Sequence, residues 1–176
     1  MTDNDVIKAF LPLLKSGLTA NGITADVLQS YQPTMQGART GDAIYFFKID
    51  DHRLGSPGHT SVYNSGTDLM DETDTQLHEA TFQFSAWIRQ TTTSTITAQD
   101  VLSVVALIMQ TRSFIESMKA AGVGVLRVTD LRNPYFKDDR DQYQASPSFD
   151  FIVQYNRSIA WTDAALVSIE STVGTA

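Results

Sequence analysis

The chain has 176 residues, enough for one domain with a hydrophobic core, and its 42% hydrophobic and 19% charged residues are typical of a globular protein. Its formal net charge of −7 argues against a general nucleic-acid-binding surface, and the absence of cysteine excludes disulfides, thiolate metal sites and a cysteine nucleophile. No apolar run reaches the roughly 20 residues that span a bilayer, and the first residues do not have the pattern of a secretory signal.

The first predicted element is a helix over residues 4–20. Its apolar residues recur at spacings of three and four, which is typical of an amphipathic helix: Val6, Phe10, Leu13, Leu14 and Leu18. Pro12 lies inside this pattern and predicts a kink or a break near residue 11. We expect residues 24–30 (TADVLQS) to add a short helical turn, and residues 33–42 to form a loop.

Three strands are expected next. Residues 43–49 (AIYFFKI) are aromatic and β-branched, which favours a strand. Residues 50–58 hold two glycines and Pro57, so we expect a turn-rich link before a short strand at 60–63. Residues 74–90 alternate between apolar and polar side chains and predict a long strand at the centre of the sheet.

The second half of the chain is expected to contain two helices and two strands. Thr97 and Asp100 are three residues apart and form a capping-box pattern at the start of the first of these helices. The expected elements are helices through 101–109 and over about 112–121, and strands at 123–129 and 149–159.

This order predicts an α+β fold with a mostly antiparallel β-sheet and helices packed on one face. We expect residues 1–176 to form a single domain, with a flexible end at 170–176.

An enzymatic interpretation has little support in the residues. There is no G-x-S-x-G, no P-loop and no dinucleotide-binding glycine pattern. His52 and His59 flank a loop close to Asp50 and Asp51, but their spacing matches no metal-binding pattern. We therefore expect no catalytic, metal-binding or cofactor-binding residues and no cofactor, and keep a small metal-dependent hydrolase as the alternative.

Two long polar connections, residues 31–41 and 130–148, are better candidates for function, because long loops in a compact domain are uncommon unless they have a role. The acidic run in the second loop lacks the spacing of a calcium-binding loop and favours a solvated or interface loop. Its aromatic residues would be costly to leave in water, at about 25 cal/mol per Å² of apolar surface. The candidate interface residues are Tyr135, Phe136, Asp138, Asp139, Arg140, Asp141, Tyr143, Gln36 and Arg39.

Three stretches resemble the neck or tail terminator proteins of tailed bacteriophages. They are residues 31–58 (YQPTMQGARTGDAIYFFKIDDHRLGSPG), residues 79–86 (EATFQFSA) and residues 120–155, which include RNPYFKDDRDQYQASPSFDFIVQY. The resemblance implies a tail-terminator-like α+β subunit and carries over no catalytic residue.

The resemblance also implies a structural role in the phage virion. Such a protein would form a ring, commonly a homohexamer, that caps the tail tube and joins it to a head–tail connector or collar protein, with the sheath as a further possible partner. DNA would pass through the ring without specific binding, helped by acidic residues facing the channel. The expected location is the neck or tail of the virion, after assembly in the host cytoplasm.

Overall fold

The computed structural model describes residues 1–30, 41–88, 96–137, 143–145 and 147–164. Its elements in chain order are α1 (Asp3–Ala20), β1 (Asp26–Gln29), β2 (Ala43–Asn64), β3 (Leu69–Trp87), α2 (Ala98–Gln110), α3 (Arg112–Ala120), β4 (Val123–Val128), β5 (Tyr135–Lys137), β6 (Tyr143–Ala145) and β7 (Ser148–Ala164).

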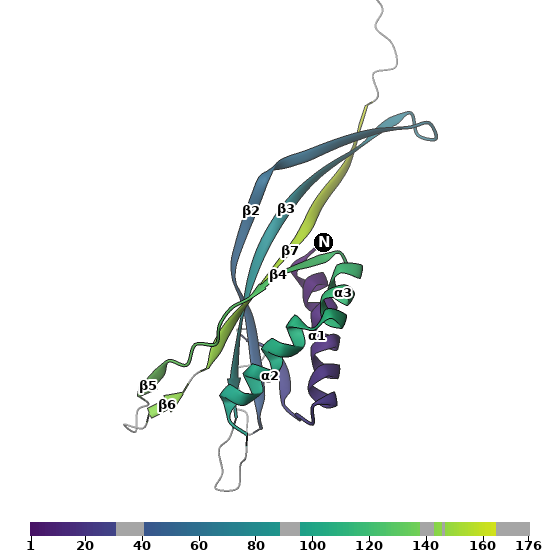
Figure 1. Ribbon diagram of the computed structural model, residues 1–176. Coiled ribbons are helices and arrows are strands. Elements are labelled where there is room, and N and C mark those ends of the chain that lie inside the picture. Colours follow the sequence, from purple (N-terminus) through teal and green to yellow (C-terminus); the bar gives the residue numbers. More distant parts are fainter. Residues whose placement is uncertain (31–40, 89–95, 138–142, 146, 165–176) are drawn as a thin grey trace, which may run out of the picture.

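The main sheet has the strand order β1-β2-β3-β7-β4. The pairing of β1 with β2 is parallel, and the remaining pairings are antiparallel. The three helices lie together on one face of the sheet (Figure 1). The predicted α+β architecture and the central position of β3 are therefore confirmed.

The core lies between α1, α2, α3 and the part of the sheet that they cover. Phe10 of α1 is fully buried and meets the rings of four strand residues edge-on, with centroid distances from 5.1 to 6.1 Å. These four residues are Phe46, Phe82, Phe84 and Phe151. Their positions follow from alternation along the strands, which points every second side chain toward the helices.

Of the kink or break predicted near residue 11, the break is wrong, because α1 is one continuous helix from Asp3 to Ala20. Proline inside a helix costs about 3 kcal/mol. Burying one apolar side chain stabilises the fold by about 1.5–3 kcal/mol. Because α1 buries a stripe of such side chains on both sides of Pro12, their burial offsets the cost of the proline. The stripe consists of Val6, Phe10, Leu14 and Leu18.

The capping box predicted for α2 is confirmed. The Asp100 amide donates to Thr97 Oγ1 over 3.1 Å, and the Thr97 amide donates to Asp100 Oδ2 over 2.9 Å. The helices α2 and α3 meet at 58°, and in the described part of the chain no single helix is long and apolar enough to cross a membrane, although this bent pair passes that test jointly.

Two local predictions between α1 and β3 are wrong. Residues 26–29 form β1 instead of a helical turn, because the chain pairs with β2 from Ala43 to Phe46. Residues 50–58 are part of a continuous β2 instead of a link, with register shifts between Lys48 and Asp50 and between Leu54 and Gly58. The predicted short strand at 60–63 is the far end of the same strand.

The described part of the connection between β4 and β7 contains β-structure. β5 and β6 pair with each other, with Phe136 opposite Gln144, and Arg132 forms an isolated bridge with Ser148. The predicted loop at 33–42 and the flexible end at 170–176 fall on residues outside the described ranges, the first apart from residues 41–42.

Candidate assembly surfaces

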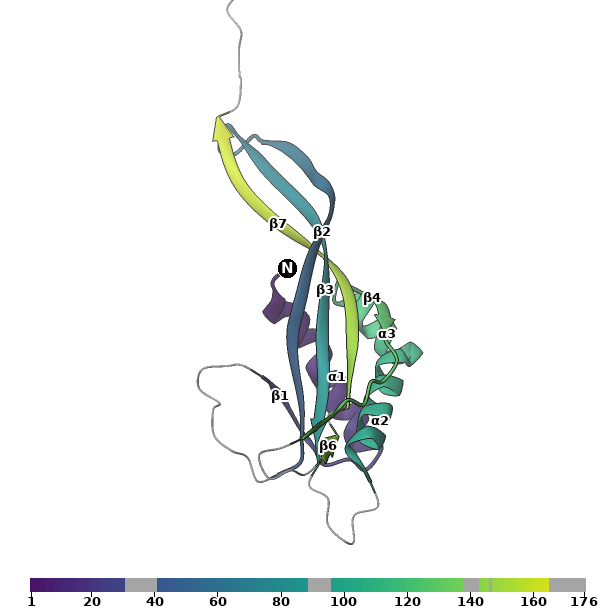
Figure 2. The ribbon, with the colours of Figure 1, turned by 90° about the vertical axis from the view of Figure 1, so that its left-hand side faces the viewer.

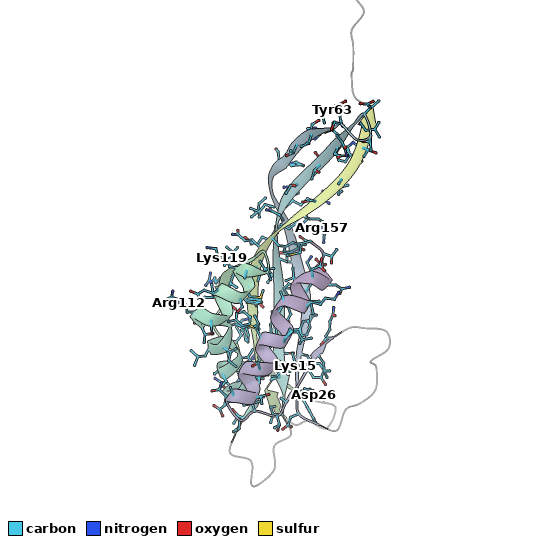
Figure 3. The ribbon with its side chains drawn as sticks, turned by 90° about the vertical axis from the view of Figure 1, so that its right-hand side faces the viewer. Lys15, Asp26, Tyr63, Arg112, Lys119 and Arg157 are labelled. Carbon is cyan, nitrogen blue, oxygen red and sulfur yellow. The ribbon has the colours of Figure 1, made fainter. Side chains whose placement is uncertain are left out.

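The strands β2, β3 and β7 continue past the helices as a three-stranded arm (Figures 1 and 2). We define the arm as residues 52–77 and 156–164. Figure 3 places Tyr63 at its far end and Arg157 at its base. No helix covers either face of the arm, so its side chains meet solvent on both sides.

Large apolar side chains of the arm are exposed. Ile159 is 67% exposed, Val62 57%, Tyr63 50% and Trp161 42%. Strand pairing places Ile159 and Trp161 on the face that carries His59, whereas Val62 lies on the opposite face. Contiguous exposed apolar surface usually marks an interaction site. The arm is therefore a candidate contact surface that the sequence-based interface residues did not include.

His59 is the centre of a polar cluster on the arm. Its Nδ1 lies 2.8 Å from Asp74 Oδ1, and its Nε2 lies 3.0 Å from Glu72 Oε2. The hydrogen bond with Asp74, followed by the charges of Glu72 and Asp74, raises the pKa of His59 above its ordinary value of 6.5. The imidazole ring also lies against Trp161, with 6.0 Å between ring centroids. The cluster ties β2, β3 and β7 together on one face.

A second polar cluster joins the base of the arm to the helical body. Asp3, in the first turn of α1, accepts three hydrogen bonds at Oδ1: from the Tyr155 hydroxyl at 2.6 Å, Lys48 Nζ at 3.0 Å and an Arg157 guanidinium nitrogen at 3.2 Å. The N-terminal ammonium group donates to the Asn156 carbonyl oxygen over 3.2 Å. One carboxylate therefore connects α1 to β2 and β7.

This cluster, which we call the joint, continues into β3. Lys48 also forms an ion pair with Asp51, whose Oδ1 lies 2.8 Å from His78 Nδ1. His78 is only 5% exposed and stacks on Tyr155 with 5.9 Å between ring centroids. A buried imidazole needs such a partner, because an unpaired polar group in the interior is costly.

The charges at the joint shift several pKa values. Burial raises the pKa of Asp3, but hydrogen bonds from Tyr155 and Lys48 outweigh burial and leave the pKa below the ordinary 3.8. Asp51 follows the same pattern through Lys48 and His78. Burial and the hydrogen bond to Asp3 raise the pKa of Tyr155 above 10.0. The carboxylates of the joint are therefore held in their charged form.

The histidines considered as metal ligands do not converge. His52 Nε2 pairs with Asp50 at 2.8 Å, whereas His59 lies farther along the arm, beyond the irregularity between Leu54 and Gly58. Among the described residues, no group of three or more histidine or acidic side chains is arranged to hold a metal ion.

The hairpin formed by β5 and β6 lies at the opposite end of the molecule from the tip of the arm (Figure 1). It carries the backbone of three predicted interface residues, Tyr135, Phe136 and Tyr143. The remaining predicted interface residues lie outside the described ranges: Gln36, Arg39, Asp138, Asp139, Arg140 and Asp141. The pairing brings Tyr135 opposite Ala145 and Lys137 opposite Tyr143.

The base of this hairpin is fixed to the sheet. Arg132 donates to Asp150 Oδ1 over 2.6 Å, and Gln83 donates to the same oxygen over 3.4 Å. Asn133 donates to Gln99 at the start of α2 over 3.1 Å. A cavity of about 690 Å³ lies here, on the sheet face away from the helices, lined in part by Gln83, Arg132 and Ser148.

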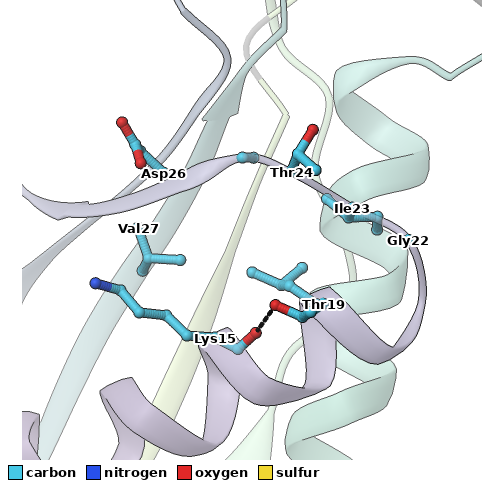
Figure 4. Close-up of a pocket in the computed structure, with 9 residues that line it drawn as sticks. Lys15, Thr19, Gly22, Ile23, Thr24, Asp26 and Val27 are labelled. Atoms are coloured by element: carbon cyan, nitrogen blue, oxygen red, sulfur yellow. Dashed lines mark hydrogen bonds between the residues drawn. The ribbon is translucent and has the colours of Figure 1, made fainter.

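A smaller cavity of about 350 Å³ lies between the end of α1 and β1 (Figure 4). Its charged lining residues are Lys15 and Asp26, and the Thr19 hydroxyl is occupied by a hydrogen bond to the Lys15 carbonyl oxygen at 3.0 Å. A nucleophile with an adjacent base, or a pair of catalytic carboxylates, is not part of this lining.

The fold resembles that of a known tail component. Among solved structures, the sheath/tube terminator of the PVC extracellular contractile injection system, in its extended state, matches with a TM-score of 0.57 and 14% sequence identity. The match covers 100% of this chain and 64% of that chain, so this chain spans less than two thirds of that terminator. At this identity the likeness shows the fold alone.

Comparison by sequence gives the family. No curated protein matches the chain. Residues 5–165, however, match the family described as E217 gateway protein gp29. This match covers β1, the arm, α2, α3 and α1 from Asp5 onward, whereas Asp3 of the joint lies just before it. It confirms the resemblance to phage neck and tail terminator proteins, and it excludes the hydrolase alternative. The chain belongs to the E217 gateway protein gp29 family, a family of structural phage proteins rather than enzymes.

Proposed function

We propose that copies of this chain assemble into a ring, commonly of six, that caps the tail tube and joins it to a head-side connector or collar protein. The ring leaves a channel through which DNA passes, and it has its place in the neck of the virion. Assembly takes place in the host cytoplasm, and the sheath is a further partner where the tail has one.

The observation that carries this proposal is the uncovered arm. A three-stranded sheet is stable when a hydrophobic face packs against something, and the arm has exposed apolar side chains on both faces. Neighbouring copies or tail proteins can supply that cover. The arm and the β5–β6 hairpin lie at opposite ends of the molecule, which suits a subunit with different contacts at each end.

A closed ring requires a heterologous interface, in which two different patches of one subunit meet. We propose that the hairpin and the loops beside it form one of these patches, through Tyr135, Phe136, Tyr143, Gln36 and Arg39 with the acidic run around Arg140. Aromatic residues and arginine are the types enriched at interface anchors.

The acidic character supports DNA passage without binding. The chain carries a formal charge of −7, and the arm alone contains Asp68, Asp71, Glu72, Asp74 and Asp163. Carboxylates that face a channel repel phosphate, so the duplex can slide. Reversing several of these acids to lysine should slow genome ejection, and unchanged ejection in every variant would count against this part of the proposal.

The proposal is tested with the purified chain and tail tubes. Native mass spectrometry and electron microscopy should detect a ring at tube ends and tubes that stop growing when the chain is added. Particles made without the chain should yield unjoined heads and tails. Tubes that grow unchanged, together with heads and tails that still join, would overturn the proposal.

A variant in which Tyr135, Phe136 and Arg140 are all alanine should stay folded and fail to join heads to tails. Arg112→Ala is the matched control, because the Arg112 side chain is 90% exposed on α3 and pairs with Glu116 of the same helix. If the triple variant unfolds, these side chains belong to the subunit core and the hairpin is not the interface.

A further inference from the structure

The outer edge of β7 is an open β-strand edge. On one side, β7 pairs with β3 along its whole length. On its other, outer side, it pairs with β4 only from Phe151 to Tyr155. The register with β3 runs from Ser148 to Ala164 without a bulge. In the described part of the chain, no strand lies along the outer side of β7 from Arg157 to Ala164.

The free hydrogen-bonding groups on this edge belong to even-numbered residues. Ser148 and Asp150 use their backbone groups on the side away from β3, toward Arg132 and Thr129. Because backbone direction alternates along a regular strand, Ser158, Ala160 and Thr162 direct their N–H and C=O groups to the same side. A regular exposed edge of this kind is a template for another strand.

The outer edge of β2 differs, because it is protected. Two irregularities interrupt its register, Gly55 has a φ of +70°, and Pro57 has no N–H to donate. Bulges and proline are the devices by which proteins block edge pairing. The arm therefore has one blocked edge and one open edge, and the difference singles out β7.

We propose that the open edge of β7 receives residues 165–176 of a neighbouring copy as an added strand. The inference rests on the proposed ring, since it requires a neighbour. It names the segment and the edge through which one copy holds the next.

The sequence of this segment, ALVSIESTVGTA, fits the edge. It is rich in β-branched residues and has one charge, Glu170. Val167, Ile169 and Val173 are two or four residues apart, so a strand would place them on one face. On that face they would extend the exposed apolar surface of Ile159 and Trp161, through cross-strand pairs of a stabilising kind.

The sequence of the segment favours pairing with β7 of a neighbouring copy over pairing with β7 of its own chain. To fold back on β7, the chain would need a tight turn directly after Ala164. Residues 165–173 contain no glycine, proline, asparagine or aspartate, the residues that such turns use. Fully extended, residues 165–176 span about 40 Å, which is longer than the open edge at about 3.3 Å per residue.

The first test uses disulfide trapping, which is clean because the chain has no cysteine. A160C and S168C variants are made separately and mixed with tail tubes, so a bond between them can form only between copies. A disulfide needs Cα atoms within about 7 Å. We expect at least tenfold more cross-linked dimer than in a mixture of A160C with S113C, which places a cysteine on exposed α3.

The second test perturbs the edge alone. Ala160→Pro removes an outward N–H without removing a bond to β3, whereas Ala160→Val keeps the N–H. We expect Ala160→Pro to lose the ring at tube ends by tenfold or more, with its circular dichroism unchanged, and Ala160→Val to keep the ring. For the cross-link, the proline is placed at Thr162 in the A160C chain, so that the cysteine is retained. This double variant should lose the cross-link to S168C by tenfold or more.

The third test does not depend on the ring. A synthetic peptide of residues 165–176 is added to the isotopically labelled full chain, and we expect the amide signals of Ser158, Ala160 and Thr162 to shift and gain protection from exchange. Rings that form while the cross-link, the proline effect and the peptide shifts are all absent overturn this inference and leave the proposed function standing. Absence of any ring overturns both.

Discussion

Replacing Asp3 with alanine should lower the free energy of unfolding by about 1–2 kcal/mol. The largest contribution comes from Tyr155, which is 1% exposed and loses the partner of its hydroxyl. An unsatisfied buried donor costs about 1–3 kcal/mol. Lys48 still pairs with Asp51 in this variant, and the exposed Arg157 can be hydrated, so the loss of these two contacts adds little to the destabilisation. Because the Asp3 side chain is 42% exposed, we take the lower part of the range.

A double-mutant cycle with Tyr155→Phe isolates this contribution. Removing the hydroxyl should cost less in the Asp3→Ala background than in the natural chain, with a coupling energy of about 1 kcal/mol. Asp5→Ala is the matched control, because Asp5 closes the capping box with Thr2 in the same turn of α1 and does not contact Tyr155. It should lower stability slightly through the lost capping box and show no coupling.

The assay is urea unfolding followed by far-UV circular dichroism, repeated across acidic pH. The folded-state pKa of Asp3 lies below its ordinary 3.8. Its contribution is therefore fully present above that ordinary value and is lost as the pH falls through the lower folded-state value. The difference between the natural chain and Asp3→Ala should shrink over that interval. Equal costs of Tyr155→Phe in both backgrounds would refute the account of the joint.

Three further predictions concern the core and the arm. Phe10→Ala should lower the free energy of unfolding by about 3–5 kcal/mol in the same assay, since it empties the space among four aromatic rings; a cost under 1 kcal/mol would contradict that packing. Gly17→Val should destabilise by about 1–3 kcal/mol, because even a Cβ there would lie 2.7 Å from Ile108 Cγ2, and adding Ile108→Ala should recover part of the loss in thermal melts. An NMR titration should give His59 a pKa above 6.5 that falls in Asp74→Asn, and an unchanged pKa would disprove the contact.

Many of the strands and helices in the body of the molecule can be predicted from local sequence patterns. The alternation in residues 74–90 predicted β3, because a strand buried on one face needs apolar side chains at every second position. Thr97 and Asp100 marked the start of α2, since a capping box is satisfied within four residues. These features need no information from distant parts of the chain, and the buried Phe82 and Phe84 could be read from them.

The candidate sites depended on distant partners. His59 meets Asp74 across a hairpin and Trp161 from β7, and no local spacing connects these residues. The joint brings Asp3 to Tyr155 and Arg157 from the far end of the chain. The predicted interface residues of the β5–β6 connection came from composition and resemblance, and their role stays a prediction.

The amino-acid sequence by itself determined the three helices, the strands β3, β4 and β7 of the body, the absence of cysteine chemistry and the family resemblance. Only the tertiary structure decided that residues 50–58, with Gly55 and Pro57, continue as a strand, and that α1 passes through Pro12 unbroken. The physical reason is the same in both cases. A local conformational preference is worth a few kcal/mol at most. It is overridden when pairing with a long strand, or burial of apolar side chains on both sides of the unfavourable residue, stabilises the fold by more.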